Sequence, residues 1–157
     1  PVYLRLGRLP VEDIYDNSYE FTWGKGVQLK DGCDVTIIAT GLMVGSALEA
    51  YEILKAQGIL ARVINIHTIK PIDREIIIKA AKETGAIVTA EEHTIIGGLG
   101  SAVCEVLSEE YPVPVKRIGI EDKFGKSGKP NELLKLYGLT PEDIVIKAKN
   151  VMTLKRK

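Results

Sequence analysis

The chain has 157 residues, which is enough for one domain with a single hydrophobic core. It carries 21 basic and 21 acidic side chains, so no overall field draws it to nucleic acid or to an acidic membrane. Its two cysteines, Cys33 and Cys104, form neither a CxxC pair nor a disulfide framework, which favours a reduced, cytoplasmic setting. No apolar run is long enough to span a bilayer, and we expect a soluble protein.

The first ten residues, PVYLRLGRLP, alternate apolar with basic side chains and do not begin with Met. We therefore expect the chain to come from the middle of a larger protein. Arg5 and Arg8 follow a strand-like segment, and a guanidinium fork can hold two oxygens of one phosphate. Two solvated arginines beside a linker would give the same pattern, and both interpretations stay open.

Strands and helices alternate along the rest of the chain. Segment 24–32 predicts a short edge strand that ends in an Asp31-Gly32 turn and runs antiparallel to its neighbour. Three strand-helix cycles follow, and continuous Val, Ile and Ala runs mark their strands as buried and parallel. The predicted strands are 34–40, 61–69, 86–92 and 115–121, and the predicted helices of the cycles are 46–58, 73–85 and 101–111.

Capping residues mark several helix ends. Asp73 is placed to cap one helix, and Gly85 is placed to end it. Two more helices close the chain; the second begins at Pro141, where Thr140 and Asp143 have capping-box spacing. This order predicts an α/β fold of three layers, in which a mostly parallel sheet lies between helices on both faces.

Two loops at the carboxyl ends of predicted strands are candidate ligand sites, because open parallel sheets bind ligands at that edge. The first loop, 40–47, places Gly41, Gly45 and Ser46 at a helix N-terminus, whose free N–H groups could hold an anion. The same small residues would also permit a tight turn from strand to helix, and this plainer interpretation is favoured.

The second loop, 91–102, begins with the only cluster of acid-base groups in the sequence, Glu91, Glu92 and His93. Its Gly98-Leu99-Gly100 stretch lacks the third glycine of a dinucleotide fingerprint, so NAD binding is not expected.

The remaining His and Cys residues give weaker signals. His67 belongs to a different strand from His93 and has no third metal ligand in sight, so no metal site is expected. Cys104 falls on the apolar side of its predicted helix and is expected in the core.

The segment FGKSGKP, 124–130, is similar at first sight to a phosphate-binding loop. That motif has four residues between its first Gly and its Gly-Lys pair. Here five residues separate Gly119 from Gly125, and the segment lies late in the chain. It therefore predicts a glycine-bearing surface loop that leads into a helix.

Five blocks of the sequence resemble the C-terminal third of transketolases: PVYLRLGR, IIATG, HTIKPID, EEHTIIGGLGSA and, most specifically, DKFGKSGKPNELLKLYGLTPEDI. The resemblance covers practically the whole chain. It implies that 1–9 end a pyrimidine-binding domain, that 10–24 form a linker and that 25–157 form the transketolase C-terminal domain. It also implies a five-stranded sheet in the order 1-3-2-4-5 with an antiparallel first strand.

The same resemblance implies a parent enzyme of the pentose phosphate pathway that transfers a two-carbon ketol unit between sugar phosphates. Such an enzyme uses thiamine diphosphate and a divalent metal, Mg or Ca, bound by domains outside this chain. The present portion would serve dimerisation and the substrate channel, and alone it is expected to be inactive. Its expected partners are the N-terminal transketolase domains or subunit, in a homodimer of the full enzyme.

One substrate contact carries over by resemblance. Arg8, aligned by PVYLRLGR, matches an arginine that in transketolases contacts the phosphate of the sugar. No residue of this chain is expected to do covalent chemistry or to bind cofactor or metal.

Two other parents stay open. Deoxyxylulose phosphate synthases and the β subunits of 2-oxo acid dehydrogenases share the strand ends and the glutamate pair. Alternatively, a free-standing regulatory module would bind a small anion at 41–46 or 97–100. Its candidate residues are Gly41, Gly45, Ser46, Glu92, His93 and Gly98.

Overall fold

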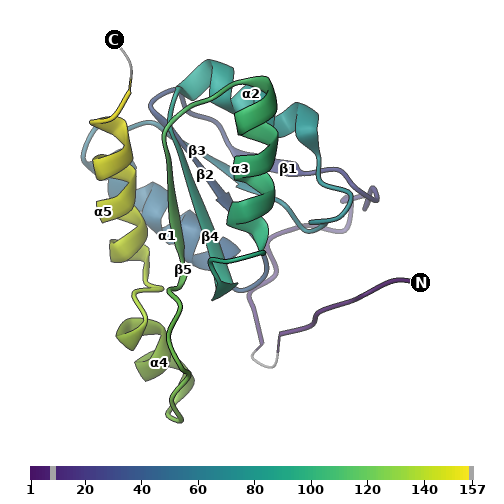
Figure 1. Ribbon diagram of the computed structural model, residues 1–157, viewed down its shortest axis with the longest axis vertical. Coiled ribbons are helices and arrows are strands. Elements are labelled where there is room, and N and C mark those ends of the chain that lie inside the picture. The colour runs from purple at the N-terminus through teal and green to yellow at the C-terminus, as the bar shows by residue number, and fades with distance from the viewer. Residues whose placement is uncertain (8–9, 156–157) are drawn as a thin grey trace.

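A computed structural model of the chain describes residues 1–7 and 10–155 (Figure 1). Its centre is one five-stranded sheet in the order β1-β3-β2-β4-β5. The strands are β1 (Val27–Lys30), β2 (Val35–Ala39), β3 (Ala61–Asn65), β4 (Ile87–Thr94) and β5 (Val115–Ile120). β1 pairs antiparallel with β3, and the other pairs are parallel. The expected α/β class, strand order and antiparallel first strand are confirmed.

Helices cover both faces of this sheet (Figure 1). The helices are α1 (Met43–Ala56), α2 (Arg74–Thr84), α3 (Leu99–Glu110), α4 (Pro130–Leu136) and α5 (Pro141–Met152). α1 and α5 pack together over one face, and α2 and α3 pack together over the other. The short α4 lies beyond the end of the sheet, at the bottom of Figure 1.

The two central strands, β2 and β3, consist mostly of apolar residues and are buried along their whole length. Their side chains alternate between the two apolar clusters: Ile37 and Val63 face α1 and α5, whereas Ile38 and Ile64 face α2 and α3. A strand that is apolar on both sides is stable only between two helical layers, which is why these two strands lie inside the sheet.

The predicted capping residues of α2 and α5 are confirmed. The Asp73 carboxylate accepts a hydrogen bond from the Ile76 N–H at the start of α2. Gly85 ends the same helix with a φ of 66°, a left-handed conformation that glycine adopts without steric cost. Thr140 and Asp143 form a reciprocal capping box at the start of α5.

Three details differ from the prediction. α1 begins at Met43, three residues before the expected start, because Gly41 turns the chain with a φ of +56° directly after β2. Gly45 and Ser46 therefore lie within the helix and not in the loop before it. β3 ends at Asn65, so the last four residues of the expected strand 61–69 lie outside the ladder.

Cys104 is also less buried than expected. It is half-buried on α3, outside both apolar clusters, and burial raises the pKa of its thiol.

The N-terminal part of the chain runs outside the sheet. Residues 1–7 and 10–24 contain no helix or strand, which is compatible with the expected linker, although the domain boundaries stay a prediction. Within the described ranges, no helix has the length and apolar character needed to cross a membrane.

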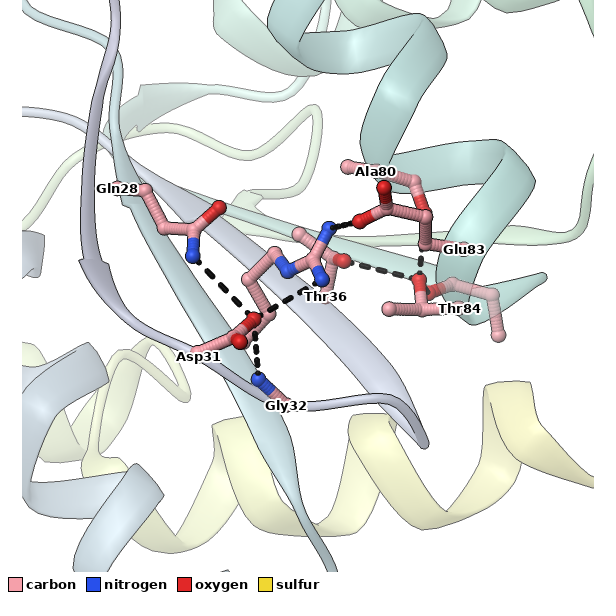
Figure 2. Close-up of polar contacts among 9 residues, drawn as sticks. Gln28, Asp31, Gly32, Thr36, Ala80, Glu83 and Thr84 are labelled. Atoms are coloured by element: carbon pink, nitrogen blue, oxygen red, sulfur yellow. Dashed lines mark hydrogen bonds and ion pairs between the residues drawn. The ribbon is translucent and has the colours of Figure 1, made fainter.

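A charged network closes the amino end of the sheet beside β1. The Arg62 guanidinium, on a residue only 6% exposed, donates to the Glu83 carboxylate on α2 and to the Asp31 carboxylate after β1. Figure 2 shows Asp31 and Glu83 reaching the guanidinium from these two elements. Asp31 also accepts from the Gly32 N–H, so the network fixes the turn that leads from β1 into β2.

The two acidic partners of Arg62 are expected to contribute unequally to stability. Glu83→Gln removes the charge from the more buried partner, and we expect the free energy of unfolding to fall by about 1 to 3 kcal/mol. Asp31→Asn changes a carboxylate that is 76% exposed, and we expect a smaller loss than for Glu83→Gln. Urea unfolding of the two variants measures both values, and an equal or reversed ranking would contradict the assignment.

Candidate functional site

The candidate site lies at the carboxyl ends of β2, β3 and β4, where open parallel sheets bind ligands. At the end of β4, Glu91 points into the protein and is 1% exposed. Its two carboxylate oxygens accept hydrogen bonds from the Leu99 N–H at 2.7 Å and the Gly100 N–H at 2.8 Å. A buried negative charge is thus held by the N–H groups at the start of α3, where the helix dipole favours it.

The loop before α3 is shaped around this carboxylate. A Cβ atom on Gly98 would lie 2.0 Å from an Oε atom of Glu91, so only glycine lets the chain approach this closely. Gly97 donates its N–H to the Ser101 hydroxyl, and that hydroxyl donates to the Ile95 carbonyl. The glycines of this loop therefore serve the packing of α3 against the protein's own glutamate.

The other two members of the acid-base cluster point elsewhere. Glu92 is partly exposed, and its carboxylate lies 3.8 Å from the Arg5 guanidinium, which also donates to the Glu92 carbonyl. His93 is exposed. Because side chains alternate along a strand, the structure separates Glu91 from Glu92 and does not bring the three groups together as one acid-base centre.

The start of α1 differs from the start of α3. Among the described residues, no side chain caps α1, and its first turn contains no acidic residue. Gly41 and Gly45 have open space where a side chain would stand. The Met43 and Val44 N–H groups at this helix start donate to the Thr40 and Gly41 carbonyls, and anion binding at loop 40–47 stays a prediction.

The end of β3 carries a cluster that sequence reasoning missed. Asn65 donates from its side-chain amide to the Tyr15 hydroxyl at 2.8 Å. The His67 ring lies 4.6 Å from the Phe21 ring, centroid to centroid. Tyr15 and Phe21 both belong to the segment before β1, and the aromatic residues spaced along YDNSYEFTW were the available signal for its docking.

The FGKSGKP segment forms an exposed loop between β5 and α4, as expected. The Tyr137 hydroxyl donates to the Phe124 carbonyl at 3.1 Å and holds the loop against the end of α4. The loop borders an open hollow of about 560 Å³, and the Phe124 side chain beside it is 99% exposed.

The cofactor expected from the resemblance does not fit the two glycine-loop N–H groups at the start of α3, because Glu91 occupies them. Across residues 1–7 and 10–155, no group of three or more His, Cys, Asp or Glu side chains is arranged to hold a metal ion. Arg8, the expected substrate contact, lies outside the described residues.

Comparison with known proteins defines the class of this fold. Residues 24–144 match the family described as Transketolase, C-terminal domain, and the chain belongs to that family.

Individual relatives are similar over nearly the whole chain. It is 50% identical over 151 residues to a 6-deoxy-6-sulfo-D-fructose transketolase subunit of Clostridium sp. (strain MSTE9), covering 96% of this chain and 47% of that protein. It is 49% identical over 122 residues to a 1-deoxy-D-xylulose-5-phosphate synthase of Heliobacterium modesticaldum, covering 77% of this chain and 19% of that protein.

A solved structure agrees with the fold in detail. It is described as a split-gene transketolase in an inactive β4 tetramer, and it shares 53% sequence identity with this chain at a TM-score of 0.90. The match covers 93% of this chain and 48% of that one, so the chain spans about half the length of such relatives.

Glu91 and Glu92 offer a matched pair for testing the buried carboxylate. Glu91→Ala leaves two buried N–H groups without a partner, and we expect the free energy of unfolding to fall by about 2 to 4 kcal/mol. Glu92→Ala removes only a partly exposed charge and should cost less than about 1 kcal/mol. Amide hydrogen exchange should show the loss of protection at Leu99 and Gly100 in the first variant alone. Similar stability of the two variants would show that Glu91 does not hold α3.

Proposed function

We propose that this chain is the C-terminal portion of a transketolase that transfers a two-carbon ketol unit between sugar phosphates. Thiamine diphosphate and a divalent metal would be bound by domains outside these residues. The observation that carries the proposal is the family match over 24–144, joined to relatives of about twice the length that are named transketolase subunits. The activity is a transferase reaction of the complete enzyme.

Within that enzyme, residues 1–9 would end the pyrimidine-binding domain, 10–24 would link it to this domain, and 25–157 would form the domain itself. Its role would be structural: to form part of the homodimer and to border the substrate channel. Exposed apolar side chains on the 91–100 loop and around α4 support a contact surface; they are Ile96, Phe124 and Leu136, at 58%, 99% and 56% exposure. The β4 tetramer of the relative supports self-association of such a section.

The partners would be the N-terminal transketolase domains or subunit, together with sugar phosphates as substrates. We place the enzyme in the cytoplasm and in the pentose phosphate pathway. The free thiols of Cys33 and Cys104 support a reduced compartment.

The isolated chain should have no ketol transferase activity. Calorimetric titration of the 157-residue chain with thiamine diphosphate and Mg²⁺ should give no binding isotherm. Mixing the chain with the section that precedes it in the parent gene should restore transfer between sugar phosphates. Micromolar binding of the cofactor by the chain alone, or inactivity of the mixture, would contradict the proposal.

Arg8 is expected to bind the substrate phosphate in the complete enzyme. A bidentate guanidinium–phosphate contact contributes roughly 1.5 to 3 kcal/mol. Arg8→Ala should therefore raise KM for phosphorylated acceptors about ten- to hundredfold and leave KM for glycolaldehyde nearly unchanged.

A second arginine provides the control for that measurement. Arg74→Ala removes a side chain on α2 that pairs with Glu109 and Glu110, and it should change neither constant. Equal effects of Arg8→Ala on both acceptors would assign Arg8 a structural role.

A deoxyxylulose phosphate synthase, or the β subunit of a 2-oxo acid dehydrogenase, is the alternative parent. The 49% identity to a synthase of the first kind supports it. The product formed by the reconstituted enzyme distinguishes the parents, since deoxyxylulose phosphate would appear only with the first alternative. The sequence that adjoins this chain in its gene would also distinguish the alternative parent enzymes.

A regulatory module that binds a small anion is a second candidate function. The start of α1 supports it, because no described side chain caps it and Gly41 and Gly45, beside Ser46, face open space. The alternative position around Gly98, Glu92 and His93 has less support, because Glu91 already binds the α3 N–H groups. A thermal shift screen with nucleotides and sugar phosphates tests the idea, and absence of any stabilising ligand would remove it.

A further inference from the structure

The segment 13–24 lies across the end of β3 and docks there through a few aromatic side chains. Its two anchors are the Tyr15 hydroxyl on the Asn65 amide, at 2.8 Å, and the Phe21 ring on the His67 ring, at 4.6 Å between centroids. Tyr19 stacks on Tyr15 with a centroid distance of 3.9 Å. The segment therefore has local structure of its own, and besides these two contacts Ile14 packs against the apolar cluster between the sheet and α1 and α5.

These anchors bury polar atoms that have no partner among the described residues. The Nε2 atom of His67 is buried without such a hydrogen bond, while Nδ1 is paired with the Thr68 hydroxyl at 2.8 Å. The Oδ1 atom of Asn65 is buried in the same way. A neutral imidazole tolerates an unpaired Nε2 lone pair, but an imidazolium has an N–H there that requires an acceptor or water.

The outer side of the docked segment remains open to solvent. Phe21 is 57% exposed, and Trp23, which contacts Phe21 edge to face at 6.3 Å, is 56% exposed. Lifting the part of the segment that carries Phe21 and Trp23 would thus expose a limited additional apolar surface, and a positive charge on the His67 ring, whose Nε2 atom is buried, opposes docking of that part.

We propose that segment 13–24 is a pH-sensitive strap, which docks over His67 when the imidazole is neutral and lifts from it when the imidazole is protonated. The device goes beyond the proposed structural role of the domain in a transketolase and does not depend on it. It would set the freedom of the segment that joins this domain to whatever precedes it.

The direction of the pH effect follows from burial. Burial lowers the pKa of His67 from its ordinary value of 6.5, whereas the lifted state has the ordinary pKa. The lifted state therefore takes up a proton first, so docking is strongest above pH 6.5 and weakens as the pH falls below it.

The other ionisable groups near His67 are not expected to control the docking of segment 13–24. Burial is the single cause of the lowered pKa of His67. The neighbouring elements carry paired groups instead: Lys25 with Asp73 and Glu75, Arg5 with Glu92, and Tyr15 with Tyr19.

The chain is well suited to the test, because it contains one tryptophan and two histidines. NMR of the 157-residue chain between about pH 7.5 and about pH 5, a range that spans the ordinary histidine pKa, follows the two imidazoles and the Trp23 indole N–H separately. We expect the Trp23 signal and the His67 ring to titrate together, with a midpoint below 6.5, while far-UV circular dichroism stays constant.

Two variants show whether His67 itself controls the strap. His67→Phe keeps an aromatic ring under Phe21 and should abolish the pH dependence of the Trp23 signal. His93→Gln, at the exposed second histidine, should leave it intact. A Trp23 transition that persists in His67→Phe, a His67 pKa at or above 6.5 through cation–π contact with Phe21, or a simultaneous loss of helical signal would each overturn the proposal.

Discussion

The bond between the Glu91 carboxylate and the first N–H groups of α3 is the interaction on which the carboxyl edge of the sheet depends. A charge on a residue 1% exposed is unfavourable unless donors surround it, and here the donors are supplied by Leu99 and Gly100. The bond requires glycine at 98 and fixes the point where the chain enters α3. Since α3 covers one apolar cluster together with α2, a side chain at the end of β4 helps to position a whole helical layer.

Two positions where open parallel sheets commonly bind ligands are thus occupied by side chains of the protein itself. Glu91 takes the place that an anion would have at α3, and the aromatic residues of segment 13–24 cover the end of β3. The exposed apolar residues Ile96, Phe124 and Leu136 lie elsewhere, on the 91–100 loop and around α4. This division supports the proposed structural role of the domain.

The sequence predicted what depends on local pattern. Apolar runs located the strands, and Asp73, Gly85 and the Thr140–Asp143 pair located helix ends, because each acts through residues within one or two turns. It placed the start of α1 too late, since small residues in 40–46 fit a loop and a first helical turn equally well. The strand order came from the family resemblance, because pairing between distant strands leaves little trace in a single chain.

The sequence predicted the candidate site less completely, because the tertiary structure and not the local pattern decides where its side chains lie. Glu91, Glu92 and His93 are adjacent in sequence, but Glu91 is buried and Glu92 and His93 lie nearer the surface, where the pairing of β4 with β5 shifts register between Ala90 and Thr94. The docking of Tyr15 on Asn65 and of Phe21 on His67 joins residues far apart in the chain, so the aromatic residues of 15–23 could signal a docked segment but not its partners.

The glycine loop before α3 is best described as a structural cradle for Glu91 and not as an anion-binding loop. Titration of the chain with inorganic phosphate and then pyrophosphate, while the amide resonances of Leu99 and Gly100 are observed by NMR, distinguishes the two roles. Both resonances should stay unchanged, because the Glu91 carboxylate holds these N–H groups. Saturable shifts of the two amides would show instead that the loop binds anions.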